Sequence, residues 1–180
     1  MISEYLLILV LFCYLQAEGQ EIPRWKLADL ENIIHNSDQP LILNFWATFC
    51  KPCLEELPYF QELAEHYKDS GLKLVLVSLD LPEDYKKISS FAEKHHINAA
   101  IVYLDETNAD LFCPVVDKDW SGSIPASLFI SHKNNYRKFF EAKISKAKLD
   151  TEVRSMMKKQ WSNFIEKIFL QIDYISIKQL

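Results

Sequence analysis

The chain has 180 residues, 49% of them apolar, which is enough for one sizeable hydrophobic core but not comfortably for two. Its formal net charge of -5 leaves no overall basic excess to attract phosphates, so nucleic-acid binding has no electrostatic support. We therefore expect one domain over residues 20–180.

An apolar segment, YLLILVLFCYL, spans residues 5–15 near the start of the chain. It has about the length of a signal-peptide core and is shorter than the roughly 20 apolar residues that cross a bilayer. Ala17 and Gly19 supply the small residues of a cleavage site after Gly19. We expect residues 1–19 to be a signal peptide and the protein to be exported, to the periplasm or another extracytoplasmic compartment. The segment before the apolar run lacks Lys and Arg, so a retained N-terminal membrane anchor or a buried helix stays an alternative.

Helical and strand patterns alternate through the middle of the chain. Apolar spacing predicts helices over residues 25–35, 51–67 and 84–95, and buried strands over residues 41–46, 72–79 and 99–104. Gly71 is expected to end the second helix. This alternation favours an α/β fold with a partly parallel sheet.

Two further strands, residues 126–131 and 136–141, flank a polar turn and predict a hairpin, which makes the sheet mixed. Asp150 is expected to cap a long last helix. An apolar stripe at helical spacing, interpreted as core packing, follows in that helix: Val153, Met156, Met157, Trp161, Phe164, Ile165 and Ile168.

Residues 107–122 form a long connection between the predicted strands, and we expect it to shape the rim above the functional site. Cys113 lies in this connection. We interpret it as an ordinary, partly buried cysteine, with a second resolving thiol as the alternative.

Cys50 falls between a buried strand and the first turn of a predicted helix. The free N–H groups and the positive dipole end of that helix stabilise a thiolate, so we expect a pKa below the ~8.5 of a free thiol. Lys51 adds a smaller, solvent-screened contribution. Cys53, one helical turn further on, is placed to attack a mixed disulfide at Cys50, and Pro52 suits the first turn between them. The spacing therefore predicts reversible dithiol exchange.

A metal site and a structural disulfide are both disfavoured as interpretations of this cysteine pair. A zinc site needs two more ligands at usable spacing, and His95 and His96 are adjacent in sequence with no second cysteine pair. A purely structural disulfide would close so short a loop that it removes little entropy from the unfolded chain.

The motif FWATFCKPC over residues 45–53 is followed by ELP at 56–58 and later by SIPA at 123–126. Together they resemble the thioredoxin superfamily and, more narrowly, the exported TlpA/ResA-like thiol-disulfide oxidoreductases. The resemblance covers roughly residues 25–141, with the usual last helix after it. It implies a thioredoxin fold, which is an α/β architecture with a central mixed sheet flanked by helices. The activity that it implies needs no bound cofactor and no metal.

The resemblance also assigns roles. Cys50 is the attacking thiol and Cys53 the resolving thiol of a redox disulfide. Pro125 matches the family's cis-proline, which lies against that disulfide, and the residue before it presents its backbone to an extended substrate. Phe49 replaces the tryptophan usual before the first cysteine. The residues implied to form the substrate-binding surface are Trp46, Phe49, Ile124 and Pro125.

Asn44 stands where cytosolic thioredoxins carry a buried aspartate that moves protons for the second cysteine, and an amide cannot titrate. The TlpA/ResA-like branch uses the glutamate of a C-x-x-C-x-x-E-x-P pattern, which maps to Glu56. We expect this carboxyl to take the Cys53 proton. Glu55 is interpreted as a solvated helix residue, and Pro58 is expected to kink the helix.

The sequence thus predicts a thiol-disulfide oxidoreductase that reduces disulfides of exported proteins through a Cys50/Cys53 cycle. Its implied partners are a disulfide-containing protein substrate and an upstream thiol electron donor, with a membrane-bound donor left open. Ala47 stands where peroxide-reducing relatives carry a threonine, which argues against a peroxidase. Two competing functions remain: a copper-handling protein of thioredoxin fold, which would favour C-x-x-x-C with a well-placed His, and a redox-inert interaction module.

Overall fold

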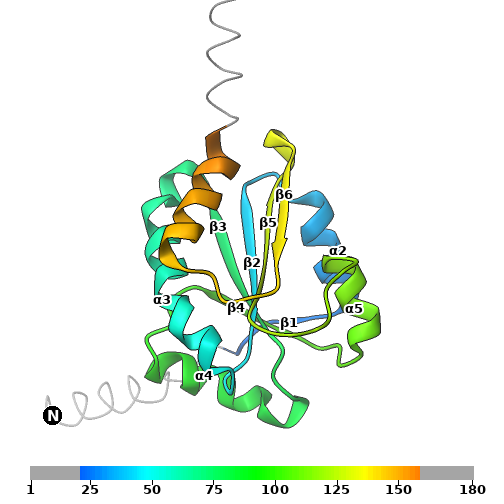
Figure 1. Cartoon of the computed structure of the whole chain (residues 1–180). Helices are drawn as coiled ribbons and strands as arrows, with labels where there is room; N and C mark the ends of the chain where they lie inside the picture. Colours follow the sequence, from blue (N-terminus) through cyan, green and yellow to red (C-terminus); the bar gives the residue numbers. More distant parts are fainter. Residues whose placement is uncertain (1–20, 159–180) are drawn as a thin grey trace, which may run out of the picture.

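The computed structural model describes residues 21–158, so the expected signal peptide lies outside the described residues. Within them, a six-stranded sheet has the order β1-β4-β3-β2-β5-β6 (Figure 1). β1, β4, β3 and β2 run parallel to one another. β5 runs antiparallel to β2, and β6 runs antiparallel to β5, so the sheet is mixed, which confirms the predicted fold class. The strands are β1 Arg24–Trp25, β2 Leu41–Trp46, β3 Lys73–Ser78, β4 Ala100–Leu104, β5 Ala126–Ser131 and β6 Tyr136–Phe140.

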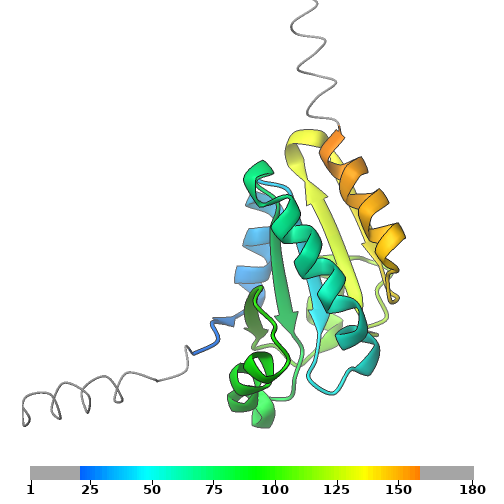
Figure 2. The same ribbon diagram turned by 90° about the vertical axis from the view of Figure 1, so that its left-hand side faces the viewer.

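Helices cover both faces of the sheet. One face carries α3, α4 and the helix over residues 146–158, called here the last described helix, and the other face carries α2 and α5 (Figures 1 and 2). The remaining bounds are α2 Leu27–Asn36, α3 Lys51–His66, α4 Tyr85–Lys94 and α5 Ala109–Val116. None of the helices in residues 21–158 combines the length and apolar character needed to cross a membrane.

Strand alternation divides the core in two. Along β2, Ile42 and Trp46 pack on the side of α3 and α4, whereas Leu43 and Phe45 pack on the side of α2 and α5. Asn44 lies between Ile42 and Trp46 in this alternation, so its polar side chain points toward α3. Every residue of β2 is buried, which explains why the strand reads as a continuous apolar run rather than an alternating one.

The start of the described chain differs from the prediction. Residues 25–35 were expected to be helical, but Arg24 and Trp25 form β1, whose partners in β4 are Tyr103 and Leu104. α2 then begins at Leu27. A two-residue strand carries no periodic pattern of its own, and only its pairing with β4 defines it.

The long connection over residues 107–122 contains a helix that the sequence pattern did not indicate. α5 begins after Asn108, whose side chain accepts a hydrogen bond from the backbone N–H of Asp110. Pro114 lies inside this eight-residue helix, which made a helix hard to predict. The buried side of α5 packs against the sheet through Phe112 and Val116.

The last described helix begins earlier than expected. Ser145 precedes it, and the Ser145 hydroxyl accepts a hydrogen bond from the N–H of Lys148 at 3.3 Å. Asp150 lies inside the helix and pairs with Arg154 at 2.8 Å, so the prediction that Asp150 caps this helix is wrong. Because both residues are short and polar, the sequence alone did not distinguish the two caps.

The apolar stripe of this helix packs as predicted where it is described. Val153 and Met156 are buried, and Met157 packs against the same core. The rest of the stripe lies outside the described residues: Trp161, Phe164, Ile165 and Ile168.

α3 continues through Pro58 to His66, so the proline does not end the helix. A short 3₁₀ turn over Lys68–Ser70 follows. Gly71 ends that turn with φ 79°, a left-handed conformation that glycine adopts without a Cβ clash, before β3 begins.

Candidate active site

The two close cysteines lie where β2 gives way to α3. The N–H of Cys50 donates to the carbonyl of Ala47 at 3.0 Å, which closes a tight turn after the strand. Cys50 is the N-cap of α3, and it is disulfide-bonded to Cys53. Cys50 is 6% exposed and Cys53 is completely buried, so Cys50 is the residue of the pair that reaches the surface.

This geometry makes Cys50 the better thiolate of the pair. Its sulfur accepts a hydrogen bond from the N–H of Cys53 at 3.3 Å, one of the free amides at the helix N-terminus. The same N–H and the helix dipole are placed to stabilise negative charge on the Cys50 sulfur after reduction. The strand and helix that the sequence predicts on either side of Cys50 therefore meet as expected.

Glu56 lies one helical turn beyond Cys53 and has no exposed surface. Asn44 Nδ2 donates to Glu56 Oε1 at 2.9 Å, and the N–H of Ile144 donates to Glu56 Oε2 at 2.6 Å. Burial raises the pKa of Glu56 to about 7, although both hydrogen bonds favour its ionised form. A carboxyl with this pKa can accept and return a proton near neutral pH.

Asn44 connects the centre of the sheet to this carboxyl. Besides Glu56, its Nδ2 donates to the hydroxyl of Ser127 at 3.0 Å, so Asn44 links β2, α3 and β5. Sequence reasoning missed Ser127 and Ile144. Ser127 became a candidate only through the antiparallel register that pairs it with Asn44, and Ile144 contributes a backbone group that no motif reveals.

The neighbouring Glu55 has a different environment. It is exposed and forms an ion pair with Lys143, whose hydrogen bond lowers the pKa of Glu55. Glu55 thus fits its interpretation as a solvated helix residue. The helix turns one carboxyl outward and the next inward, as a helical periodicity requires.

The peptide bond between Ile124 and Pro125 is cis. Pro125 directly precedes β5, and the register of β5 on β2 pairs Ala126 with Phe45. That register brings the cis bond to the end of β2 from which the cysteine turn departs. Pro125 is buried and Ile124 is partly buried.

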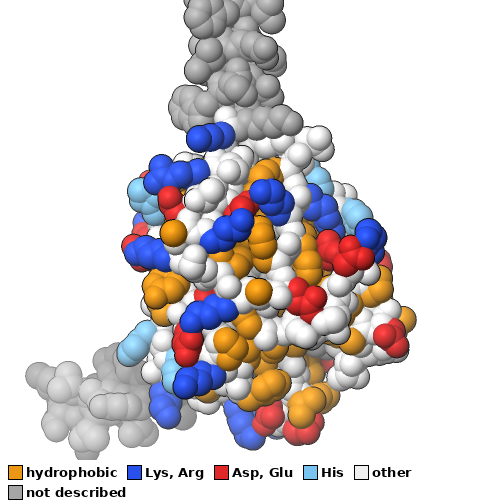
Figure 3. Space-filling model, in the orientation of Figure 1, with side chains coloured by type: hydrophobic (Ala, Val, Ile, Leu, Met, Phe, Trp, Pro, Cys, Tyr) orange, Lys and Arg blue, Asp and Glu red, His pale blue; other side chains and the backbone are white. Residues whose placement is uncertain are grey.

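A groove of about 280 Å³ lies beside the cysteine turn. Phe49 is 66% exposed and Leu81 is 51% exposed at its border, and Ile124 lines it from the cis-proline loop. The acidic side chains lining it are Asp80 and Glu106. Figure 3 shows hydrophobic side chains gathered on the lower part of the molecule, the end at which β2 leads into α3 in Figure 1.

Trp46 does not belong to this surface. Its side chain has no exposed area, and its ring lies 6.2 Å from that of Phe91 in α4, centroid to centroid. Its assignment to the substrate-binding surface is therefore corrected: Trp46 packs inside the core beneath the cysteine turn. Phe49, three residues further along the motif, is its exposed aromatic residue.

Cys113 is buried in α5, and burial raises the pKa of its thiol. A thiol with a raised pKa holds less reactive thiolate, which favours the interpretation as an ordinary buried cysteine. Within residues 21–158, no three His, Cys, Asp or Glu side chains form a group that could hold a metal ion.

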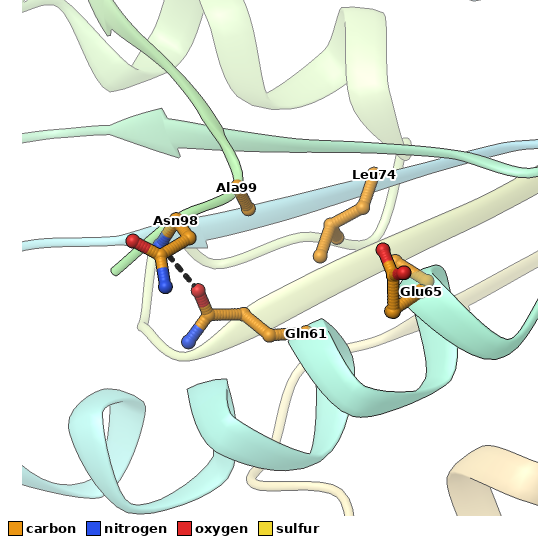
Figure 4. A pocket seen from close by; sticks show the side chains of 6 residues that line it. Gln61, Glu65, Leu74, Asn98 and Ala99 are labelled. Atoms are coloured by element: carbon orange, nitrogen blue, oxygen red, sulfur yellow. Dashed lines mark hydrogen bonds between the residues drawn. The ribbon is translucent and has the colours of Figure 1, made fainter. Parts of the chain in front are cut away.

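A separate hollow lies between α3 and the segment leading into β4 (Figure 4). The side chain of Gln61 accepts a hydrogen bond from the N–H of Asn98, and Leu74 and Glu65 line the same hollow. Gln61 follows Cys53 by eight residues along α3, which corresponds to roughly 12 Å of helix. This hollow is therefore distinct from the disulfide site.

The AhpC/TSA family model matches residues 14–138. The chain is 27% identical over 144 residues to the thiol-disulfide oxidoreductase ResA of Geobacillus thermodenitrificans, covering 78% of each chain. A shorter match to ResA of Oceanobacillus iheyensis reaches 47% identity over 55 residues, 31% of this chain and 26% of the relative.

The fold is shared with solved structures. A thioredoxin-related protein from Neisseria meningitidis serogroup B superposes with a TM-score of 0.58 at 21% identity, over 68% of this chain and 87% of that one. StoA from Bacillus subtilis gives a TM-score of 0.51 at 26% identity, over 66% and 84% of the two chains. The predicted thioredoxin fold is thereby confirmed, and the chain belongs to the AhpC/TSA family.

Proposed function

We propose that this protein is a thiol-disulfide oxidoreductase that reduces disulfides of exported proteins. The observation that carries the proposal is the Cys50–Cys53 disulfide at the N-terminus of α3, with the buried carboxyl of Glu56 one turn behind it. The similarity to proteins named thiol-disulfide oxidoreductase ResA supports the same activity.

The first step is attack of the reduced Cys50 thiolate on a substrate disulfide. A new S–S bond forms between Cys50 and one substrate sulfur, while the other substrate sulfur leaves as a thiolate and takes a proton. Cys50 is suited to this role because it is the less buried member of the pair and lies against the free N–H groups of α3.

The second step resolves the mixed disulfide. Cys53 gives its proton to the Glu56 carboxylate and attacks the Cys50 sulfur. The bond between Cys50 and the substrate breaks, the second substrate sulfur leaves as a thiolate that takes a proton from solvent, and Glu56 releases its proton to solvent. The substrate gains two electrons and two protons, and the cysteine pair is left as the internal disulfide. An upstream thiol donor then returns two electrons to the pair and completes the cycle.

Substrate contact is assigned to three residues around the cysteine turn. Phe49 offers an exposed aromatic surface, and Ile124 and Pro125 offer the backbone before β5 to an extended polypeptide. The groove beside them has room for a side chain adjoining the target cysteine. No cofactor is required, since the electrons pass between sulfur atoms.

Export is part of the proposal and rests on residues 1–19 as a signal peptide or an uncleaved anchor. An exported reductase works where substrate disulfides form, so it depends on a donor that delivers electrons to that compartment. The donor and the substrate are both thiol-containing proteins in this account.

The activity is tested by reducing the purified protein and adding it to insulin. We expect stoichiometric loss of insulin disulfides with the wild-type protein and none with Cys50→Ser. Cys53→Ser should instead accumulate a mixed disulfide through Cys50, visible on a non-reducing gel. Absence of both reduction and trapping would support the redox-inert module.

A copper-handling role and a peroxidase activity are tested separately. Copper titration of the reduced protein would favour copper handling only if tight binding occurs without insulin reduction. Peroxide consumption is expected to be absent, because the buried Ala47 provides no hydroxyl at the position where peroxide-reducing relatives carry a threonine.

A further inference from the structure

Asp80 is a buried acidic residue that no motif in the sequence indicates. It follows the end of β3 and is 3% exposed. Its carboxylate accepts hydrogen bonds from the Thr48 N–H at 3.0 and 3.2 Å, from the Thr48 hydroxyl at 2.5 Å and from the Ser78 hydroxyl at 2.7 Å. Among the described residues, these donors are all neutral, so hydrogen bonds rather than a counter-charge hold the carboxylate.

Thr48 lies inside the turn that leads from β2 to Cys50. The Cys50 N–H closes that turn on the carbonyl of Ala47, and just before it the Leu79 N–H donates to the carbonyl of Trp46 at 2.8 Å. The Asp80 carboxylate therefore fastens the middle of the cysteine turn to the end of β3. Three hydrogen bonds make this connection, and all of them come from Thr48: its N–H donates to both carboxylate oxygens of Asp80, and its hydroxyl donates to one of them.

We propose that Asp80 is a positioning residue, which holds the turn so that the Cys50 sulfur stays against the N-terminus of α3. The inference rests on the proposed dithiol function. Stabilisation by the free N–H groups falls off within the first helical turn, so a looser turn would weaken it. Asp80 also lines the groove beside Phe49, which joins the fixed turn to the proposed substrate surface.

If Asp80 positions the turn, its removal changes the pKa of Cys50 in one direction; if Asp80 acts only through its charge, its removal changes that pKa in the other direction. A negative charge near Cys50 disfavours its thiolate, so removing that charge alone would lower the pKa of Cys50. Loss of the hydrogen bonds between Asp80 and Thr48 would move the Cys50 sulfur away from the helix N-terminus and raise the pKa of Cys50. The sign of the change therefore distinguishes the two.

The test compares Asp80→Ala with Asp80→Asn in the reduced protein. Alanine removes every acceptor, whereas asparagine removes the charge but keeps an oxygen for the Thr48 N–H. The rate of Cys50 alkylation by iodoacetamide is measured across pH. The other charged groups near Cys50 stay unchanged in both variants: Lys51, Glu55 and Glu56 on α3, and Glu106 in the groove. We expect Asp80→Ala to raise the pKa of Cys50 by about one unit, which reduces the thiolate fraction about tenfold at pH values well below that pKa. In Asp80→Asn, the thiolate fraction of Cys50 should stay close to that of the wild-type protein.

A lowered pKa of Cys50 in both variants would assign Asp80 an electrostatic role and overturn the proposal, and so would an unchanged pKa in Asp80→Ala. Thr48→Val provides a milder variant, because it removes only the hydroxyl hydrogen bond and keeps the N–H. It should shift the pKa in the same direction as Asp80→Ala, by less. If Asp80→Ala does not fold, an unchanged pKa of Cys50 in Thr48→Val contradicts the proposal.

The alkylation readout is independent of the proposed function. If the wild-type protein fails to reduce insulin, the proposed activity is wrong, while the comparison of Cys50 pKa values still tests the role of Asp80. If the wild-type protein is active and the variants keep its Cys50 pKa, the role of Asp80 alone is wrong.

Discussion

At the scale of single residues, the cysteine motif predicted the chemistry but not the network that supports it. Cys50 and Cys53 could be assigned from their spacing at the start of one helix, and Glu56 from the family resemblance. The contacts of Ser127 and Asp80 could not, because they connect positions far apart in sequence whose proximity depends on strand register. The sequence also does not reveal which aromatic residues near the cysteines are exposed: Trp46 is predicted at the surface but is buried.

Glu56 should make the stability of the oxidised protein depend on pH. Its folded pKa of about 7 exceeds the ordinary value of 4.5, so its stabilising contribution is full below pH 4.5 and is lost as the pH rises through 7. A shift of this size corresponds to about 3 kcal/mol at most. We expect Glu56→Gln to flatten the decline in unfolding free energy between pH 5 and pH 8, measured by chemical denaturation.

The matched control for this measurement is Glu55→Gln, which changes the adjacent exposed carboxyl. Because Glu55 is solvated, that variant should keep the wild-type pH dependence in this range. Parallel profiles for the wild-type protein and Glu56→Gln would show that Glu56 does not titrate as described.

Glu56 should also affect one catalytic step more than the other. Since its carboxyl is assigned to the proton of Cys53, Glu56→Gln should slow resolution of a mixed disulfide, by at least about tenfold, and leave the initial attack by Cys50 nearly unchanged. Single-turnover kinetics with a fluorescent disulfide peptide would resolve the two steps. Equal rates in the variant and the wild-type protein would reduce Glu56 to a structural residue.

At the scale of elements, strong periodicity predicted well and short or interrupted segments did not. β2 and β5 have the predicted bounds, because each is an apolar run buried on both faces. β1 was missed because only its pairing with β4 defines it, and α5 because Pro114 interrupts a short helix. The start of the last described helix was misplaced because Ser145 and Asp150 are both suitable caps.

The last described helix is joined to β6 by the buried Glu152. Lys138 from β6 and Lys148 from the helix lie 2.9 and 3.0 Å from its carboxylate oxygens, and the Tyr136 hydroxyl donates to it. Burial opposes ionisation most strongly as a single cause, but the hydrogen bonds from Tyr136, Lys138 and Lys148 outweigh it and lower the pKa of Glu152 to about 2. This carboxylate therefore fixes the helix to the sheet edge.

We expect Glu152→Gln to lower the free energy of unfolding at pH 7 by about 1 to 3 kcal/mol. Because the folded pKa is depressed, this stabilisation is present above the ordinary value of 4.5 and is lost as the pH falls through about 2. Asp150→Asn, which breaks an ion pair on the exposed side of the same helix, should change stability by less than about 1 kcal/mol. Chemical denaturation at pH 7 and pH 3 checks both variants. If the difference in unfolding free energy between the wild-type protein and Glu152→Gln does not shrink at pH 3, the role assigned to Glu152 is wrong.

At the scale of the whole molecule, alternating strand and helix patterns were sufficient to predict a mixed sheet flanked by helices, and the structure has that architecture. The sheet determines where the chemistry occurs: the end of β2, the loop after β3 and the cis bond before β5 converge on one edge. Direction of electron flow is a property of this assembly. We propose a reductant because the apolar Ile124, which precedes the cis-proline, offers no hydroxyl to the disulfide.

The central claim is that Cys50 and Cys53 cycle reversibly as a reducing dithiol. Its most direct test is to equilibrate the purified protein in glutathione buffers of graded potential and to count the free thiols of each species by alkylation. We predict a two-electron transition, absent in Cys53→Ser, with a midpoint below roughly -200 mV. A midpoint near the roughly -120 mV of the oxidant DsbA, or a cysteine pair that does not titrate at all, would contradict the account.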